Sequence, residues 1–267
     1  FARFRARYAV VDPEYPTQVR QWINQDELTD KLDRHMLRVR TADVVDLPGL
    51  INERVEFELS GKAMAAYREI EDQLATIVDE EEIEVPNVLA KLLRLQQVTS
   101  GEMTYQGKPV TFGTAKRDVL LDRISDLPTG EPVVVFVRFR ADIEAVRYVA
   151  EKTGRRFGQI SGDQKDLTSH ATMPADVDLM AVQESAGGVG IDLTRAHIGF
   201  WYSLSFSLGD FEQAQARMHR PGQTQPVLMY HLVARGTVDE AIYRALAKRR
   251  RVVDAIVEQF RNERIEV

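Results

Sequence analysis

The chain has 267 residues, 44% of them hydrophobic and 28% charged, a composition ordinary for a globular protein with a sizeable core. Its formal net charge of −6 gives no global attraction to nucleic acid, so any such contact needs a local basic surface. The lack of cysteine excludes disulfides and thiolate metal sites, and no apolar run approaches the ~20 residues of a membrane span. We therefore expect no membrane partner and a cytoplasmic, nucleoid or nuclear protein that is not secreted.

Residues 1–48 mix aromatic, basic and helix-breaking side chains. The chain begins at Phe1 with neither a methionine nor a signal-peptide pattern, and we interpret it as a fragment of a longer protein. A helix is predicted from about Asp26 to Leu37.

A helical region is predicted next. Val55–Leu59 alternates like a strand, and Ser60 is a good N-cap for a long helix to about Val78. Pro86 opens another amphipathic helix that ends near Gly101. Met103–Gly113 is predicted to form a short hairpin.

From Thr114 onward, short apolar strands alternate with helices. The predicted strands are Val133–Val137, Phe157–Ile160, Val177–Val182, Ile198–Tyr202 and Val227–Leu232. The predicted helices are Lys116–Leu127, Ala141–Lys152, a short one near Asp163–Thr168, one around Gln213, and Val238 to about Phe260. This alternation predicts an α/β fold, with a mostly parallel sheet covered by helices on both faces.

The segment Ala186–Thr194 is rich in glycine, which lets the backbone approach a ligand closely. In the segment Gln213–Gln223, the offsets of four and three residues predict that Gln213, Arg217 and Arg220 share one helical face. Planar, permanently charged donors on one face suit a polyphosphate or a nucleic-acid backbone. Because both segments follow strands, we expect them at the carboxyl edge of the sheet, where such folds bind ligands. The alternative is a plain turn and surface ion pairs.

These segments resemble a known family. AGGVGIDLT is similar to motif V of the superfamily-two helicases, and QAQARMHRPGQ resembles motif VI in the form of the Swi/Snf-type ATPases. Five residues further upstream resemble the linker between the two lobes of those motors: Met36, Leu37, Arg38, Leu47 and Pro48. The resemblance implies the second, C-terminal RecA-like lobe of a DNA-translocating motor.

The resemblance also implies four regions. Residues 1–53 correspond to the interlobe linker, 54–113 to a helical insertion, 114–235 to the RecA-like lobe, and 236–267 to a long C-terminal brace helix. The upstream first RecA-like lobe and double-stranded DNA are the implied partners, and nothing in the sequence predicts an oligomeric state.

The resemblance further implies roles for single residues. Arg217 and Arg220 match the arginine fingers that reach the γ-phosphate of ATP. The implied nucleotide-binding residues are Gln213, Gly188, Gly190 and Asp192. Asp192 has the alternative role of a local turn acceptor. The implied contacts to the DNA backbone are Arg138, Arg140, Ser161, Gly162 and Thr194, and ordinary surface polarity is the alternative for each of them.

Two parts of a nucleotide motor are missing from the sequence. Gly61-Lys62-Ala63 fails the phosphate-loop pattern, and so does the other glycine–lysine pair, at 107–108. Asp239-Glu240-Ala241 mimics an acidic box, but it falls in the first turn of a predicted helix, where acidic residues favour the helix dipole. We therefore expect ATP and Mg²⁺ to be bound mainly by the missing first lobe, no metal site in this chain, and no activity of this chain alone. The alternative functions are a strand-separating or RNA-dependent helicase lobe, and a non-catalytic binding module.

Overall fold

The computed structural model describes residues 1–11, 13, 19–35, 46–78, 85–105, 108–167, 172–184, 190–249, 252, 255 and 256. The chain divides into two compact units, Phe1–Asp46 and Leu47–Val267. The larger unit contains both motif segments.

The smaller unit contains two helices and a two-stranded antiparallel sheet. In chain order its elements are α1 (Ala2–Tyr8), β1 (Ala9–Val11), β2 (Val19–Trp22) and α2 (Gln25–Asp33). An ion pair of 2.6 Å between Arg7 and Glu27 joins α1 to α2. The helix predicted from Asp26 is present as α2, while residues 36–38 of the linker pattern lie outside the described residues.

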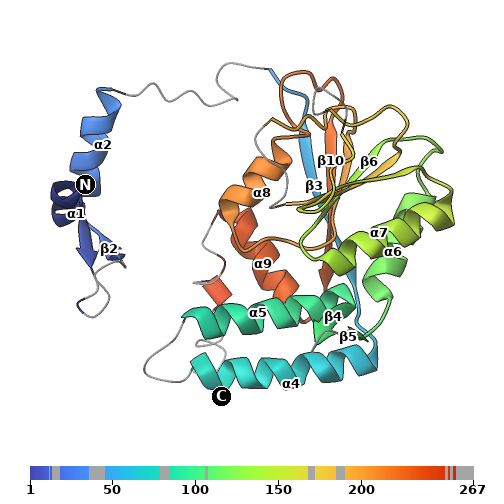
Figure 1. The fold of residues 1–267 in the computed structure, drawn as a ribbon, viewed down its shortest axis with the longest axis horizontal. Coiled ribbons are helices and arrows are strands. Elements are labelled where there is room, and N and C mark those ends of the chain that lie inside the picture. Colours follow the sequence, from blue (N-terminus) through green and yellow to red (C-terminus); the bar gives the residue numbers. More distant parts are fainter. Residues whose placement is uncertain are drawn as a thin grey trace. The chain divides into compact units, whose positions relative to one another are not determined.

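The larger unit is built on a six-stranded sheet with the order β3-β10-β9-β6-β8-β7, whose described pairings are parallel (Figure 1). The strands are β3 (Leu50–Phe57), β6 (Val133–Val137), β7 (Phe157–Ile160), β8 (Leu179–Gln183), β9 (Ile198–Trp201) and β10 (Val227–Ala234). The predicted α/β fold is confirmed. Because β3 pairs with β10 along its whole length, the sheet includes residues on both sides of the linker boundary predicted after Glu53.

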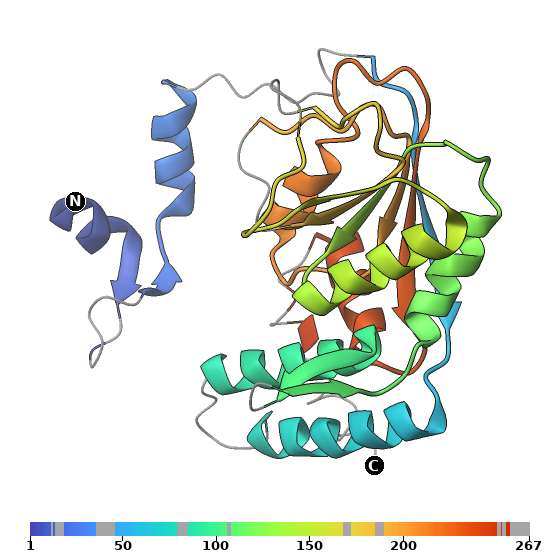
Figure 2. The same ribbon diagram turned by 45° about the vertical axis from the view of Figure 1, so that its right-hand side comes forward.

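Helices cover both faces of this sheet (Figures 1 and 2). Successive strand residues point to opposite faces, so Val134 and Phe136 join one core while Val133 and Val135 join the other. The first core includes residues of α5 (Val85–Ser100), α8 (Leu208–Gln215) and α9 (Val238–Ala247). The second includes residues of α6 (Ala115–Ser125) and α7 (Arg140–Thr153).

The predicted helical region is also present. Helix α4 (Gly61–Val78) packs beside α5, and the Ser60 hydroxyl accepts a hydrogen bond from the backbone N–H of Ala63 at 3.3 Å, as an N-cap does. The predicted hairpin is confirmed as β4 (Glu102–Tyr105) paired antiparallel with β5 (Lys108–Thr111).

Two helix predictions are wrong: the short helix near Asp163 is absent, and the last helix is shorter than predicted. Residues 161–167 form a turn instead of a short helix, because the Ser161 hydroxyl accepts hydrogen bonds from the backbone N–H groups of Asp163 and Gln164. Helix α9 ends at Ala247, and Arg249 has a left-handed backbone with φ of 52°. Residues 252, 255 and 256 are helical again, so the predicted helix to about Phe260 is interrupted after Ala247.

Candidate nucleotide and nucleic-acid site

The motif VI segment begins as a helix and ends as a series of turns. Ser207 caps α8 by accepting a hydrogen bond from the backbone N–H of Asp210. The helix ends at Gln215, and the backbone N–H of Arg217 bonds to Ala214 O, three residues back. The prediction that Gln213, Arg217 and Arg220 share one helical face is therefore wrong, because only Gln213 lies in the helix.

The direction of α8 decides where the arginines lie. The helix leaves the carboxyl end of β9 and, with 8 residues, carries the chain back by about 12 Å. After the helix, the ring Nε2 of His219 donates a hydrogen bond to Pro48 O at 2.7 Å, and Pro48 lies just before the start of β3. Arg217 O accepts from the backbone N–H of Leu193 at 3.0 Å, in the loop that leads into β9. The arginines therefore lie beside the amino ends of the strands, and the predicted carboxyl-edge position is wrong for them.

The two arginines differ in exposure. Arg217 is 5% exposed, and burial lowers the pKa of its guanidinium from the ordinary value. Arg220 is half-buried, and its Nη1 donates to Ile191 O at 3.4 Å. Gln213 is exposed. Guanidinium groups held partly out of water interact with an anion more strongly than solvated ones.

The motif V loop, defined here as residues 190–196, packs against these turns. Gly190 has φ of 103°, a conformation that favours glycine, while Gly188 lies outside the described residues. The carboxylate of Asp192 accepts hydrogen bonds from the backbone N–H and the hydroxyl of Thr194, at 2.9 and 2.7 Å. This is the local turn that the sequence left open as the alternative role of Asp192.

The other predicted DNA-contacting residues lie apart from this group, at the carboxyl ends of β6 and β7. Arg138 is turned inward: its Nη1 donates to Leu204 O at 3.3 Å, and its guanidinium lies 4.1 Å from the centre of the Phe206 ring. Burial lowers the pKa of Arg138, an effect that the nearby Glu184 opposes. Its contacts are those of a structural arginine.

Arg140 and Gly162 are the exposed members of this second group. The Arg140 side chain is 79% exposed and pairs at 2.8 Å with Asp163, whose side chain is 66% exposed. Gly162 is exposed, with open space where a Cβ would stand. Ser161 is buried, with its hydroxyl engaged in the turn described above. A phosphate has access to Arg140 and to the backbone at Gly162.

Glu184 is a buried ionisable residue whose position the sequence did not predict. It is 6% exposed, and both its carboxylate oxygens accept a hydrogen bond from the backbone nitrogen of Ser205, each at 3.1 Å. Burial raises its pKa to about 8, and the charge of Arg138 opposes that rise. The available signal was a carboxylate that directly follows the apolar strand Leu179–Gln183.

The chain matches the family described as "Helicase conserved C-terminal domain" over residues 115–222. It is 29% identical over 136 residues to a zebrafish (Danio rerio) chromodomain-helicase-DNA-binding protein 1-like, covering 49% of this chain and 13% of the relative. It is 28% identical over 138 residues to a Caenorhabditis elegans homologue of SWI/SNF-related matrix-associated actin-dependent regulator of chromatin subfamily A containing DEAD/H box 1, covering 50% and 14%. Residues 115–222 therefore form a helicase C-terminal domain, and the relatives of the chain include SWI/SNF-related proteins.

A solved structure supports the fold of the larger unit. The Sulfolobus solfataricus SWI2/SNF2 ATPase core in complex with dsDNA superposes with a TM-score of 0.58 at 20% identity, over 92% of this chain and 53% of that one. The mostly parallel sheet is thus that of the RecA-like C-terminal lobe of these ATPases. The chain spans only 13% and 14% of the lengths of the two relatives named above.

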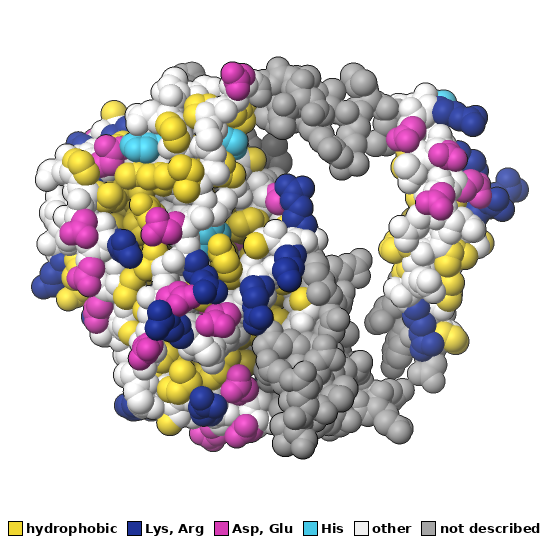
Figure 3. All heavy atoms as spheres, turned by 180° about the vertical axis from the view of Figure 1, so that it is seen from behind, with side chains coloured by type: hydrophobic (Ala, Val, Ile, Leu, Met, Phe, Trp, Pro, Cys, Tyr) yellow, Lys and Arg dark blue, Asp and Glu magenta, His cyan; other side chains and the backbone are white. Residues whose placement is uncertain are grey.

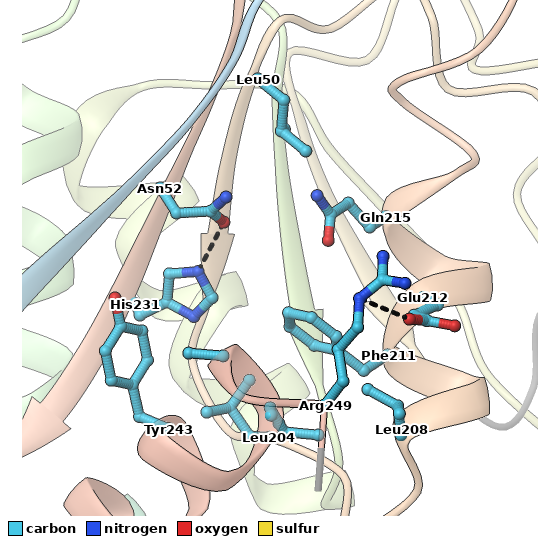
Figure 4. Close-up of a pocket in the computed structure, with 12 residues that line it drawn as sticks. Leu50, Asn52, Leu204, Leu208, Phe211, Glu212, Gln215, His231, Tyr243 and Arg249 are labelled. Carbon is cyan, nitrogen blue, oxygen red and sulfur yellow. Dashed lines mark hydrogen bonds and ion pairs between the residues drawn. The ribbon is translucent and has the colours of Figure 1, made fainter. Parts of the chain in front are cut away.

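The larger unit also contains a cavity of about 300 Å³ between α8, α9 and strands β3 and β10 (Figure 4). Buried His231 bonds to Asn52 Oδ1 through Nε2 at 2.9 Å, and burial lowers the pKa of the imidazole to about 3. Arg249 and Glu212 form an ion pair of 3.4 Å at the wall of the cavity. None of the described residues that were predicted to contact the nucleotide or DNA lines this cavity.

Within the part of the chain that the structure describes, no cluster of three or more His, Asp or Glu side chains has the arrangement of a metal site. In that same part, the helices are all too short or too polar to span a membrane.

Proposed function

We propose that this domain is the second motor lobe of an ATP-dependent double-stranded-DNA translocase. The observation that carries the proposal is the packing of the motif VI turns against the motif V loop. The Leu193–Arg217 backbone bond and the Arg220 bond to Ile191 O hold both arginines in one local framework. The relatives named as helicases and chromatin regulators, and the related core solved with dsDNA, support the same assignment.

In this proposal Arg217 and Arg220 stabilise the negative charge that develops on the transferred phosphoryl group of ATP. Gln213, Gly190 and Asp192 lie at or beside the same turns and face the nucleotide or shape the loop around it. ATP and Mg²⁺ are held mainly by the upstream lobe, where the ion would neutralise phosphate charge. Preorganised guanidinium groups act without a reorganisation cost at the moment of reaction, which suits a finger role.

In the same proposal, the DNA backbone binds to the residues at the carboxyl ends of β6 and β7. Exposed Arg140 and the backbone at Gly162 are the proposed primary contacts, with Ser161 shaping the turn and Arg138 holding the strand end in place. Thr194 lies in the motif V loop beside the proposed nucleotide-binding residues, so any contact that it makes with DNA is made from that loop. On the face shown in Figure 3, Lys and Arg side chains are interspersed with Asp and Glu.

The test is DNA-stimulated ATP hydrolysis by the protein that carries this domain together with its upstream lobe. Arg217→Ala is expected to lower kcat by about 10³-fold or more, the scale of an arginine finger. Arg123→Ala, at an exposed position on α6, is the matched control and should hydrolyse ATP normally. Unchanged hydrolysis by Arg217→Ala would contradict the finger role. Strand displacement in a parallel assay, or stimulation by RNA alone, would favour a strand-separating or RNA-dependent motor instead.

A further inference from the structure

Gln223, the last residue of the motif VI segment, is buried against the motif V loop. It is 7% exposed. Its amide nitrogen donates toward three backbone carbonyls: Thr194 O at 3.2 Å, Ala196 O at 3.1 Å and Met218 O at 3.3 Å. Two of these carbonyls belong to the motif V loop, and the third directly follows Arg217. One side chain therefore joins the two segments.

The other end of the same amide is also fixed. Its oxygen accepts hydrogen bonds from the backbone N–H groups of Thr224 at 2.9 Å and Gln225 at 3.1 Å. Carbonyls only accept and backbone N–H groups only donate, so these partners define one orientation of the amide. A side chain that lacks either the donor or the acceptor leaves buried backbone groups without hydrogen-bond partners, which lowers the stability of the folded state.

The turn before Gln223 returns the chain to this position. Gly222 has φ of 106°, and the backbone N–H of Gln223 bonds to Arg220 O at 3.0 Å. Arg217 and Arg220 thus lie in a short segment that is fixed at both ends. The Leu193–Arg217 backbone hydrogen bond holds one end, and the Gln223 amide holds the other.

We propose that Gln223 is a positioning residue for Arg217 and Arg220. It sets their location by tying the motif VI turns to the motif V loop. The inference rests on the proposed function of the two arginines, and it assigns Gln223 a role in catalysis exerted only through them. Because the amide is buried and its nitrogen and oxygen are both engaged, contact with ATP or DNA is not part of the role.

The test is Gln223→Glu in the protein that includes the upstream lobe. Glutamate has the same shape, but it replaces the donor that faces three carbonyls with an acceptor. A displacement of about 1 Å at a catalytic group costs about 100-fold in rate, so we expect a loss of that order in kcat. The KM for ATP should change far less, because the arginines act mainly in the transition state. Gln225→Glu, at an exposed neighbouring position, is the matched control and should behave as wild type.

A double-variant cycle separates positioning from general structural damage. If Gln223 acts only through the two arginines, adding Gln223→Glu to the variant Arg217→Ala/Arg220→Ala should lower kcat by no more than about twofold further, since both arginine side chains are already absent. Independent losses that multiply would overturn the inference. If Gln223→Glu does not fold, Gln223→Met provides the same cycle, because it keeps the volume and lacks the amide.

The two proposals fail in different ways. Normal hydrolysis by a folded Gln223→Glu or Gln223→Met variant, while Arg217→Ala is inactive, would overturn the positioning role alone. Normal hydrolysis by Arg217→Ala would overturn the proposed function, and the positioning role with it.

Discussion

Replacing Asp239 by asparagine should strongly destabilise the larger unit, because it leaves a buried ammonium group without its anion. Lys116 Nζ lies 2.8 Å from Asp239 Oδ2, and the two side chains are only 1% and 5% exposed. The other carboxylate oxygen accepts a hydrogen bond from the Thr99 hydroxyl at 2.9 Å. The carboxylate therefore connects helices α5, α6 and α9, and asparagine keeps its shape while removing its charge.

Removing one partner of a buried ion pair costs about 3–5 kcal/mol. The ammonium also lies 5.6 Å from the centre of the Phe57 ring and 5.8 Å from that of Tyr202. These contacts remain in the variant and retain part of the stabilisation, so we expect the lower end of the range, about 3 kcal/mol. In a unit of this size that corresponds to a Tm lower by about 6–12 °C.

The assay is urea-induced unfolding of this chain at pH 7, with thermal unfolding as a second readout. Adding Lys116→Met to Asp239→Asn removes the stranded charge and should recover part of the lost stability. Asp122→Asn, at an exposed position on α6, is the control for the loss of a surface charge. A double variant as unstable as Asp239→Asn alone, or an Asp239→Asn variant within about 1 kcal/mol of wild type, would refute the charge argument.

Three further predictions follow from the same structure. Burial raises the pKa of Glu184 to about 8 from 4.5, so the folded state binds one more proton than the unfolded state between those pH values. Stability should fall as pH rises through that window, by at most ~1.4 kcal/mol per pH unit, and urea midpoints of Glu184→Gln should lack this slope. Arg138→Ala should lower stability by about 1–3 kcal/mol, because it removes a buried charged donor, whereas Arg140→Ala should weaken DNA binding at unchanged Tm. This chain alone should show no ATP turnover with or without duplex DNA. If the wild-type chain did hydrolyse ATP and the Arg217→Ala variant did not, the upstream lobe would be dispensable and this prediction would be wrong.

Local sequence was sufficient to locate most of the sheet. Val133–Val137 is a strand with the bounds that its apolar run predicts, because strands covered on both faces read as continuous hydrophobic segments. The hairpin and the helices around it were likewise predictable, since caps, prolines and helical periodicity act over a few residues.

The environment of single side chains was not predictable in this way. An arginine that follows a strand reads the same in sequence whether it meets solvent or protein. Arg140 meets solvent, whereas Arg138 stacks on Phe206 and bonds to Leu204 O. That difference depends on which loop returns to the strand end, a property of the assembled sheet.

The sequence by itself determined which residues form the motif V and motif VI segments and that they belong to an α/β lobe. Only the tertiary structure decided that Arg217 and Arg220 lie beside the amino ends of the strands, away from Arg140 and Gly162. It also decided that Gln223 joins the two motifs, through bonds to carbonyls as many as 29 residues away in the chain. Local periodicity encodes the conformation of a segment, but the order of strands and the direction in which a helix returns across them are set by long-range packing. Hydrogen bonds between distant segments form only once that packing exists.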